Sequence, residues 1–474
     1  MNKNIINKIR IARLPGILIL FFVIPISAQV ISGGGAHSLS ICNDNTAMAW
    51  GLNVSGQLGN GDTLNRNIPV QVNGITGIIA ISGGNAHTLA LKNDGTVWAW
   101  GANNKGQLGN GTQTFHNNIP TQIIGLSGII AISAGLNHSI ALKNDGTVWA
   151  WGKNYNGQLG IGSLQDTLYP AKVHLLTNII AIGAGQEFSI ALKNDGTVWA
   201  WGYDDYCQIG GGGGGNFIEP LLDTSLQNIV SISCGWRHYF AIKNDGTVWG
   251  KGDNTSGQMG LGSVFYCSSP PTQNNTLFGI KSIACGAVNT IALKADSTVL
   301  AWGYGGSGVL GDGTTIFLNP NPVPVVGLTS IVSIACGSGH SLALKSDGTL
   351  WSWGGNGYGQ LGNGTWSTAG CMCDSVPVQV NNLCILLGVE EINNEVEEIN
   401  IYPNPCTSQL GIRIDELGIK GIRILNILGE VVISDWSLVN SKSAGIDVGN
   451  LAKGLYFVEV KTEKGIKRKK FVKE

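Results

Sequence analysis

Five histidines recur at one position of a regular pattern, and imidazole is the side chain best suited to proton transfer or metal binding near neutral pH. They are His37, His87, His138, His238 and His340. Phe188 and Asn289 stand at the same position in two further copies. A catalytic base is needed once, and a ring of metal ligands would need every copy. The repetition therefore predicts a structural hydrogen-bonding role for these histidines.

An aspartate also recurs, in an Asp-Gly-Thr sequence or a close variant. These aspartates are Asp94, Asp145, Asp195, Asp245, Asp296 and Asp347. Turn formation explains them, because Asp-Gly favours tight turns between strands. No unrepeated Ser-His-Asp group or carboxylate pair stands out, and the run Gly210–Gly215 lacks the Lys-Ser/Thr of a phosphate-binding loop. We predict no catalytic residue, no metal and no cofactor.

The cysteines do not indicate a metal site either. Cys234, Cys285 and Cys336 share a repeated position where other copies have Gly or Ala, so small buried residues are expected there. Cys371 and Cys373 lie in a Cys-Met-Cys loop without the second pair of ligands that a zinc site needs. Export from the cytoplasm would permit disulfides, which the sequence alone does not assign. The pairings considered are Cys207–Cys267 and Cys371–Cys373.

Departures from the repeat are more informative for function than the repeat itself. One copy has Lys251 where the others have Trp, and an insertion around Phe265-Tyr266 is expected to form a long loop. Aromatic residues and arginine, which are enriched at interaction hot spots, also interrupt the pattern. We therefore predict a partner-binding face, with drift in tolerant loops as the alternative. The residues assigned to this face are Trp236, Arg237, Tyr206 and Tyr358.

The element that must position these residues is a hairpin that occurs seven times, as Asn-Asp-Gly-Thr-Val-Trp-Ala-Trp-Gly or a close variant. Its closing glycines, spaced 50 or 51 residues apart, are Gly51, Gly101, Gly152, Gly202, Gly252, Gly303 and Gly354. In the second copy, strands are predicted at 77–82, 87–92 and 96–100, and Ile119-Pro120 opens a fourth. Four antiparallel strands in each of seven units predict an all-β fold, a seven-bladed β-propeller.

Composition agrees with a tightly packed array of sheets. Glycine contributes 70 of 474 residues but recurs periodically, and charged residues make up only 12%. Of the 14 tryptophans, 11 occupy two strand positions where packing between blades is expected. Residues 29–388 carry 13 Lys and Arg against 17 Asp and Glu, and no stretch of them is basic. The array therefore lacks the charge that nucleic-acid binding requires.

The units GxxHSLALKxDGTVWAWG and NxxGQLGNGT resemble the regulator-of-chromosome-condensation repeat. Gly-Gln-Leu-Gly recurs at 56–59, 106–109, 157–160 and 359–362. The resemblance covers roughly residues 30–383. It implies a seven-bladed propeller, which we assign to a domain at 29–384.

Members of that family differ in activity, so the resemblance does not settle function. One family activity is nucleotide exchange on a small GTPase through an inserted β-wedge, and no comparable insertion occurs here. A light-sensing member stacks repeated Gly-Trp-Arg-His motifs, of which only Gly235–His238 is present. We predict a non-enzymatic module that binds an extracellular protein or polysaccharide. A propeller-face hydrolase or lyase, and an exchange factor, are the alternatives.

The C-terminal region follows a different pattern. Tyr402-Pro403-Asn404-Pro405, ILNILGEVV, IDVGNLAKGLYFVEV and KGIKRKKFVKE occur in that order and resemble the C-terminal sorting domain of type IX secretion. The resemblance implies an Ig-like β-sandwich at 400–474, after an acidic linker at 385–399, and recognition by the type IX machinery. The assigned sorting-signal residues are Pro403, Asn404, Pro405, Gly429, Gly454, Lys469 and Lys470. For the basic end, a solvated strand edge is the alternative.

Residues 1–28 have the pattern of a secretory signal peptide. Basic residues precede the apolar stretch Gly16–Ile24, which is too short to span a bilayer, and Ser27-Ala28 offers a cleavage point. An uncleaved anchor is the alternative. We predict a monomer without a transmembrane segment in the mature chain, secreted or held at the outer-membrane surface of a Gram-negative bacterium.

Overall fold

Every regular element in the described part of the chain is a β-strand. The computed structural model describes residues 30–210, 214–367, 373–384, 400–403, 406–413, 421–425, 431–435, 443–452, 454–462 and 465–473. The predicted signal peptide, the linker and Cys371 lie outside these residues. No helix of membrane-spanning length and hydropathy occurs among the described residues. The chain divides into two compact units, Met1–Val389 and Glu390–Glu474.

Seven four-stranded antiparallel sheets follow one another along the first unit, each made of four consecutive strands. Blade 1 contains β1 (Ile31–Gly33), β2 (His37–Ile41), β3 (Ala47–Gly51) and β4 (Arg66–Gln71); blade 2 contains β5 (Ile78–Gly83), β6 (His87–Lys92), β7 (Val97–Ala102) and β8 (His116–Gln122). Blade 3 contains β9 (Ile129–Ala134), β10 (His138–Lys143), β11 (Val148–Gly152) and β12 (Thr167–Lys172); blade 4 contains β13 (Ile179–Ala184), β14 (Phe188–Lys193), β15 (Val198–Tyr203) and β16 (Asn216–Asp223).

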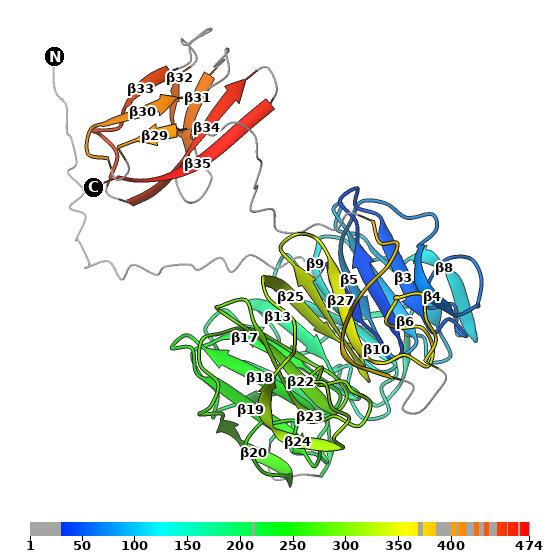
Figure 1. Cartoon of the computed structure of the whole chain (residues 1–474). Helices are drawn as coiled ribbons and strands as arrows, with labels where there is room; N and C mark the ends of the chain where they lie inside the picture. The colour runs from blue at the N-terminus through cyan, green and yellow to red at the C-terminus, as the bar shows by residue number, and fades with distance from the viewer. Residues whose placement is uncertain are drawn as a thin grey trace, which may run out of the picture. The chain divides into compact units, whose positions relative to one another are not determined.

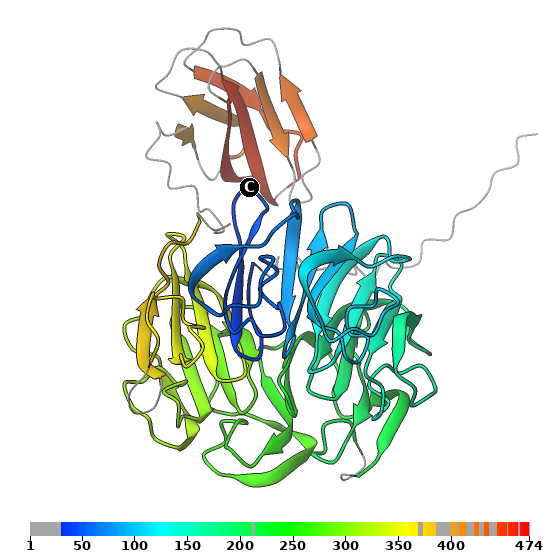
Figure 2. The ribbon, with the colours of Figure 1, turned by 90° about the vertical axis from the view of Figure 1, so that its right-hand side faces the viewer.

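The remaining blades repeat this order. Blade 5 contains β17 (Ile229–Cys234), β18 (His238–Lys243), β19 (Val248–Asn254) and β20 (Phe265–Gln273); blade 6 contains β21 (Ile280–Cys285), β22 (Asn289–Lys294), β23 (Val299–Tyr304) and β24 (Leu318–Pro324); blade 7 contains β25 (Ile331–Cys336), β26 (His340–Lys345), β27 (Leu350–Gly355) and β28 (Cys373–Gln379). The blades form a ring in which the first (blue) lies beside the seventh (yellow), as Figures 1 and 2 show. The predicted seven-bladed propeller is confirmed.

The hairpins give the ring two distinct faces. Because consecutive strands are antiparallel, the turn after the first strand and the loop after the third strand of each blade lie at one end, here called the loop face. The Asp-Gly turns lie at the other end. In blade 2, Gly95 adopts a φ of 76° and Asp94 accepts a hydrogen bond from the backbone N–H of Thr96 at 3.0 Å. These contacts confirm the turn role predicted for the repeated aspartates.

Each blade buries apolar side chains against its neighbour on both faces of its sheet. Between blades 1 and 2, Leu39, Ile41 and Ala49 pack in one cluster with Ala90 and Trp100. Equivalent clusters occur at the following interfaces. Burial on both sides explains why the strands are apolar at successive positions rather than alternating with polar residues.

A buried tryptophan closes most of these interfaces with a hydrogen bond to the preceding blade. Trp100 is fully buried, and its Nε1 donates to the carbonyl oxygen of Gln57 at 2.9 Å. Thr88 donates to the same oxygen at 2.9 Å, so this carbonyl serves as a double acceptor. A Cβ at Gly59, whose φ is 68°, would lie 2.7 Å from Nε1 of Trp100. The same indole bond is made by Trp50, Trp151, Trp201, Trp302 and Trp353.

The hydrogen-bonding role predicted for the repeated histidines is confirmed. His37 Nε2 lies 3.1 Å from Thr88 Oγ1 in the next blade. Because the Thr88 hydroxyl hydrogen is used in the bond to Gln57, the histidine must donate from Nε2, which leaves Nδ1 as an unpaired acceptor. The corresponding pairs are His87–Ser139, His138–Ser189, His238–Thr290 and His340–Ser38.

The ring is closed covalently as well as by packing. Cys42, directly after β2, forms a disulfide with Cys384, which follows blade 7, across a sequence separation of 342 residues. His340 of blade 7 bonds Ser38 of blade 1 at 2.8 Å. Among the described residues, blades 1 and 7 are each built from four consecutive strands and share none. The disulfide therefore ties the two ends of the array together, a link that the sequence analysis did not anticipate.

The second unit is a small sandwich of two sheets, as predicted. One sheet contains β29 (Asn400–Tyr402), β30 (Gln409–Arg413) and β33 (Ser443–Asp447); the other contains β31 (Gly421–Leu425), β32 (Val431–Asp435), β34 (Gly454–Thr462) and β35 (Gly465–Lys473). Leu410 and Ile446 from the first sheet pack with Ile422 and Val458 from the second. The β35 strand forms an edge of its sheet.

We expect acid to destabilise the propeller between about pH 6.5 and pH 4. Burial lowers the histidine pKa to about 3 for His37, His138 and His238, and to about 4 for His87 and His340. The unfolded chain takes up these protons below its histidine pKa of about 6.5, whereas the folded chain does not. The stabilisation is therefore complete above pH 6.5 and is lost as the pH falls, by about 1.4 kcal/mol per histidine and pH unit.

Urea unfolding followed by tryptophan fluorescence at several values between pH 7.5 and pH 5 measures this loss. His340→Asn, which copies Asn289 of blade 6, should remove one fifth of the slope. A free energy of unfolding that does not change over this range would contradict the prediction.

Candidate functional site

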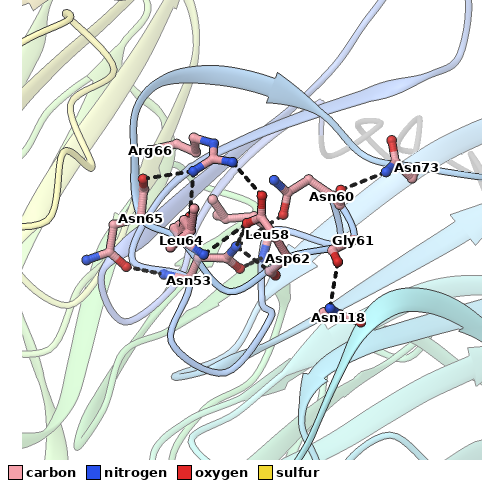
Figure 3. Close-up of polar contacts among 10 residues, drawn as sticks. All are labelled: Asn53, Leu58, Asn60, Gly61, Asp62, Leu64, Asn65, Arg66, Asn73 and Asn118. Carbon is pink, nitrogen blue, oxygen red and sulfur yellow. Dashed lines mark hydrogen bonds and ion pairs between the residues drawn. The ribbon is translucent and has the colours of Figure 1, made fainter.

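The loops of the loop face share an internal scaffold built on an asparagine. In blade 1, Asn53 Oδ1 accepts the backbone N–H of Leu58 at 2.9 Å, and Asn53 Nδ2 donates to Asn60 and Asp62 (Figure 3). Arg66 pairs with Asp62 and donates to the carbonyl oxygen of Leu64. These contacts hold the loop that carries Gly59 against the next blade.

The scaffold recurs in five blades, whereas blade 4 carries an aspartate and blade 6 carries Gly305 at this position. The equivalents of Asn53 are Asn103, Asn154, Asn254 and Asn356. In blade 4 the position is Asp204, which accepts the N–H of Ile209 at 2.6 Å and is 1% exposed. Burial raises the pKa of Asp204 above its ordinary value.

The interface between blades 4 and 5 differs from the others in its buried polar groups. Lys251 replaces the tryptophan, and its Nζ lies 2.5 Å from Asp223 Oδ2 and 2.8 Å from the carbonyl oxygen of Ile209. The two charged side chains are each 3% exposed. Tyr239 takes the Ser/Thr position and donates to Asp223 at 3.2 Å, while its ring packs against Phe188 at the histidine position. At this interface a buried ion pair takes the place of the indole, and the contact between Phe188 and Tyr239 takes the place of the bond from the histidine.

A disulfide crosses the same interface on the loop face. Gly56 closely approaches the outermost strand of the next blade, where its Cβ would lie 2.6 Å from Asn118 Cα. In blade 4 this glycine is Cys207, which forms a disulfide with Cys267 in β20. Of the two pairings considered from the sequence, this one is present. Cys371 lies outside the described residues, and Cys373 is disulfide-bonded.

Five aromatic and basic side chains gather around this disulfide and are here called the tyrosine patch. They are Tyr203, Tyr206, Trp236, Arg237 and Tyr266. The rings of Tyr206 and Tyr266, adjacent in sequence to the two bridged cysteines, are 5.9 Å apart, and those of Tyr203 and Tyr206 are 6.2 Å apart. The Arg237 guanidinium lies 4.3 Å from the Tyr206 ring, and its Nη1 donates to Tyr206 Oη at 2.7 Å.

Further hydrogen bonds hold the patch in place. Arg237 Nε donates to Gln186 Oε1 at 2.8 Å, and Tyr266 Oη donates to the Asp205 carbonyl oxygen at 3.2 Å. Tyr203 Oη donates to an Asp205 carboxylate oxygen at 2.5 Å, which raises the pKa of Tyr203 to about 12. The patch is therefore positioned by neighbouring groups in blades 4 and 5.

A polar recess of about 110 Å³ opens beside the patch. It is lined by Gln186, Glu187, Tyr203, Tyr206, Gln208, Trp236 and Arg237. Glu187 is paired with Lys153 and with the Asn156 amide from the blade 3 loop. Three blades therefore contribute to the surroundings of the recess.

Three of the four predicted partner-binding residues meet in this patch. Tyr206, Trp236 and Arg237 line one recess, whereas Tyr358 lies in the corresponding loop of blade 7, where it is 48% exposed. Phe265-Tyr266, expected in a long loop, begins β20 instead. The sequence analysis did not single out Tyr203, Gln186 or Glu187. Their signal was position on the loop face, since Gln186 and Glu187 lie in the turn between β13 and β14, and Tyr203 ends β15.

The predicted sorting-signal residues fall in the second unit or outside the described residues. Pro403 is exposed after β29, Gly454 begins β34, and Lys469 and Lys470 lie in the edge strand β35. The remaining three, Asn404, Pro405 and Gly429, lie outside the described residues.

A central cavity of about 720 Å³ runs between the innermost strands of the seven blades. Its described lining contains Gly, Ser, Ala, aliphatic residues, Cys, Asn85, Trp236 and Lys281, with no carboxylate or imidazole. Cys234, Cys285 and Cys336 line it and are half-buried rather than fully buried as expected, because they face this cavity. Burial raises the pKa of Cys285 and Cys336 to about 12, so these thiols stay protonated.

The described residues contain no cluster of three or more His, Cys, Asp or Glu side chains suited to a metal ion. In the tyrosine patch Arg237 is hydrogen-bonded to Tyr206 and to Gln186, and beside the patch Glu187 is paired with Lys153. The arrangement suits recognition of a ligand at the surface.

The fold and the loop face define a β-propeller joined to a small β-sandwich, and comparisons identify both parts. The RCC1-like domain matches residues 76–395, and the regulator of chromosome condensation (RCC1) repeat matches residues 45–91. The secretion system C-terminal sorting domain matches residues 400–474. The chain therefore belongs to the RCC1-like propeller family and carries a type IX sorting domain.

Known proteins show the same relationship. The chain is 30% identical over 345 residues to the ultraviolet-B receptor UVR8 of Arabidopsis thaliana, which is 72% of this chain and 56% of the receptor. The crystal structure of Prp20p from Saccharomyces cerevisiae has a TM-score of 0.65 and 23% identity, covering 75% of this chain and 87% of Prp20p. Human WBSCR16 has a TM-score of 0.62 and 22% identity, covering 71% of this chain and 93% of that one. The chain thus spans about half the length of the receptor, and the solved structures support the fold.

We expect Lys251→Ala to destabilise the chain by about 3–5 kcal/mol, because it leaves Asp223 buried and unpaired. The double variant Lys251→Met/Asp223→Leu removes both charges and should cost less than this single variant. Urea unfolding at pH 7.5 measures both. Lys172→Ala, at an exposed position of β12, is the control and should change stability by less than about 0.5 kcal/mol. A loss of stability in the double variant that equals or exceeds the loss in Lys251→Ala would contradict a coupled pair.

Proposed function

We propose that this chain is an exported, non-enzymatic binding protein that recognises an extracellular partner through the tyrosine patch. The sorting domain indicates that the propeller is secreted or held at the cell surface and that it interacts with the type IX secretion machinery. The convergence of Tyr206, Trp236 and Arg237 beside one recess supports the binding role. Tyr358 is not included in this proposal.

The patch has the composition and support expected of a recognition site. Aromatic rings and an arginine are the side chains that contribute most at interaction hot spots. Here they are held by a disulfide and by charged and polar neighbours, so little ordering is needed on binding.

A hydrolase or lyase finds less support in the molecule. The described lining of the central cavity offers no carboxylate and no imidazole. At the patch, Glu187 is neutralised by Lys153, and Asp205 accepts a hydrogen bond from Tyr203. We include no nucleotide exchange and no nucleic-acid binding in the proposal, because the array has more acidic than basic residues. The proposed protein is monomeric.

Capture of surface material tests the binding role. The exported protein, immobilised in its native form, is incubated with detergent-solubilised outer membranes and with extracellular polysaccharide from the producing cells. We expect retained material that is lost, by about tenfold or more in affinity, in the variant Tyr206→Ala/Arg237→Ala. Tyr169→Ala, an exposed tyrosine of the outer strand β12, should retain it. Equal retention by the patch variant would contradict the proposal.

Deletion of residues 400–474 tests the export route. Without the sorting domain the propeller should accumulate in the periplasm, because recognition by the secretion machinery is lost. Cell fractionation followed by immunoblotting measures the distribution of the protein. The charge-reversed variant Lys469→Glu/Lys470→Glu keeps the sorting domain in the chain, so it separates a loss of recognition from a loss of folding. An unchanged amount at the cell surface after deletion would contradict the assignment.

A further inference from the structure

We infer that the ligand of the tyrosine patch is a neutral polysaccharide, bound as a segment of several sugar units. This inference rests on the proposed binding function. It follows from the chemistry of the recess, the exposed rings near it and the balance of charge around it.

The recess is lined by groups that suit hydroxyls. Among the described residues, the amide nitrogens of Gln186 and Gln208 and the Nη2 of Arg237 have no hydrogen-bond partner, while Gln186 Oε1 and Arg237 Nε are fixed by their mutual bond. The Glu187 carboxylate supplies acceptor oxygens on the same lining. A sugar hydroxyl accepts from an amide and donates to a carboxylate, so it can use both kinds of group. The volume of about 110 Å³ admits part of a sugar ring rather than a larger apolar group.

An exposed aromatic ring lies beside the recess, and a second exposed tyrosine belongs to a loop that contacts it. Tyr266 is 60% exposed, and its ring lies against Tyr206. Tyr155 is 71% exposed and precedes Asn156, whose amide bonds Glu187 of the recess. The face of an aromatic ring is electronegative and attracts the polarised C–H groups of a pyranose. These exposed rings suit a chain of linked sugars that extends beyond the recess.

The charges favour a neutral ligand. Lys153 pairs with Glu187, and the Asp205 carboxylate lies beside the tyrosines that Arg237 contacts. An anionic polysaccharide would need cations without carboxylate partners, and the patch does not supply a cluster of them.

A protein partner is less well matched to this centre. The core of a protein interface is depleted in charged residues and of standard size, about 800 Å² on each partner. Here two amides, a carboxylate and a guanidinium share the lining of the recess with aromatic rings. A protein is therefore an outcome that the experiment must distinguish.

Calorimetry and affinity electrophoresis of the full exported chain test the inference. The neutral probes are the hexasaccharides of cellulose, starch, laminarin, mannan and xylan; the acidic probes are oligogalacturonate, alginate and hyaluronan fragments. We expect binding of at least one neutral probe, weakened about tenfold or more by Tyr266→Ala and by Tyr155→Ala. Tyr358→Ala, at the Tyr206 loop position of blade 7, should change the affinity by less than about twofold.

The outcomes separate the ligand class from the binding function. Binding confined to acidic probes, or equal binding by the wild type and both tyrosine variants, would overturn the inference. If no neutral probe binds while capture of a surface protein depends on Tyr206 and Arg237, the ligand class is wrong and the proposed function stands. If no ligand of any kind depends on the patch, both are wrong. Circular dichroism of each variant shows whether a loss comes from unfolding.

Discussion

The interaction on which the rest of the structure depends is the bond from a buried indole to a loop carbonyl of the preceding blade. Trp100 reaches Gln57 in this way, and five other blades repeat the contact. It is coupled to a second constraint, since the indole fits only where the loop supplies a glycine with positive φ such as Gly59. The tryptophan and the glycine therefore recur together, because both are needed for the same interface, and in five blades the asparagine of the loop scaffold accompanies the glycine.

This constraint also explains why one interface stands apart. Once Lys251 replaces the indole, the interface must satisfy a buried ammonium group, and Asp223 and Tyr239 change with it. A buried ion pair is weaker support than well-packed apolar groups, and a disulfide crosses the same interface nearby. The loop of blade 4 is thereby held by contacts that differ from those of the other blades, namely the bond from Lys251 to the Ile209 carbonyl oxygen and the disulfide to Cys267.

Much of the fold could be predicted from the sequence because its signals are local and repeated. The Asp-Gly turns, the strand composition and the spacing of 50 or 51 residues indicate seven blades without knowledge of any contact between them. The role of the histidines also followed from repetition. By contrast, the pairing of Cys42 with Cys384 depends on the closure of the ring across 342 residues, and no local pattern encodes it.

The candidate site was predictable only in part. Trp236, Arg237 and Tyr206 could be recognised as departures from a repeat, but nothing in the sequence says which departures meet in space. Tyr206 and Tyr358 hold the same loop position, and only the first lies beside Arg237. Gln186 joins the patch because its turn in blade 4 faces the turn of blade 5 that carries Arg237. Such contacts arise from the assembly of the ring and not from any one unit.

The most direct test of the central claim, that recognition is located at the blade 4–5 interface, is amide hydrogen exchange of the full chain. Exchange is measured with and without saturating polysaccharide extracted from the surface of the producing cells. With polysaccharide bound, we expect slower amide exchange in residues 203–208, 236–237 and 265–268, and unchanged exchange in the loops of blades 1 and 7. Protection confined to the central cavity or to other blades, with none at this interface, would contradict it.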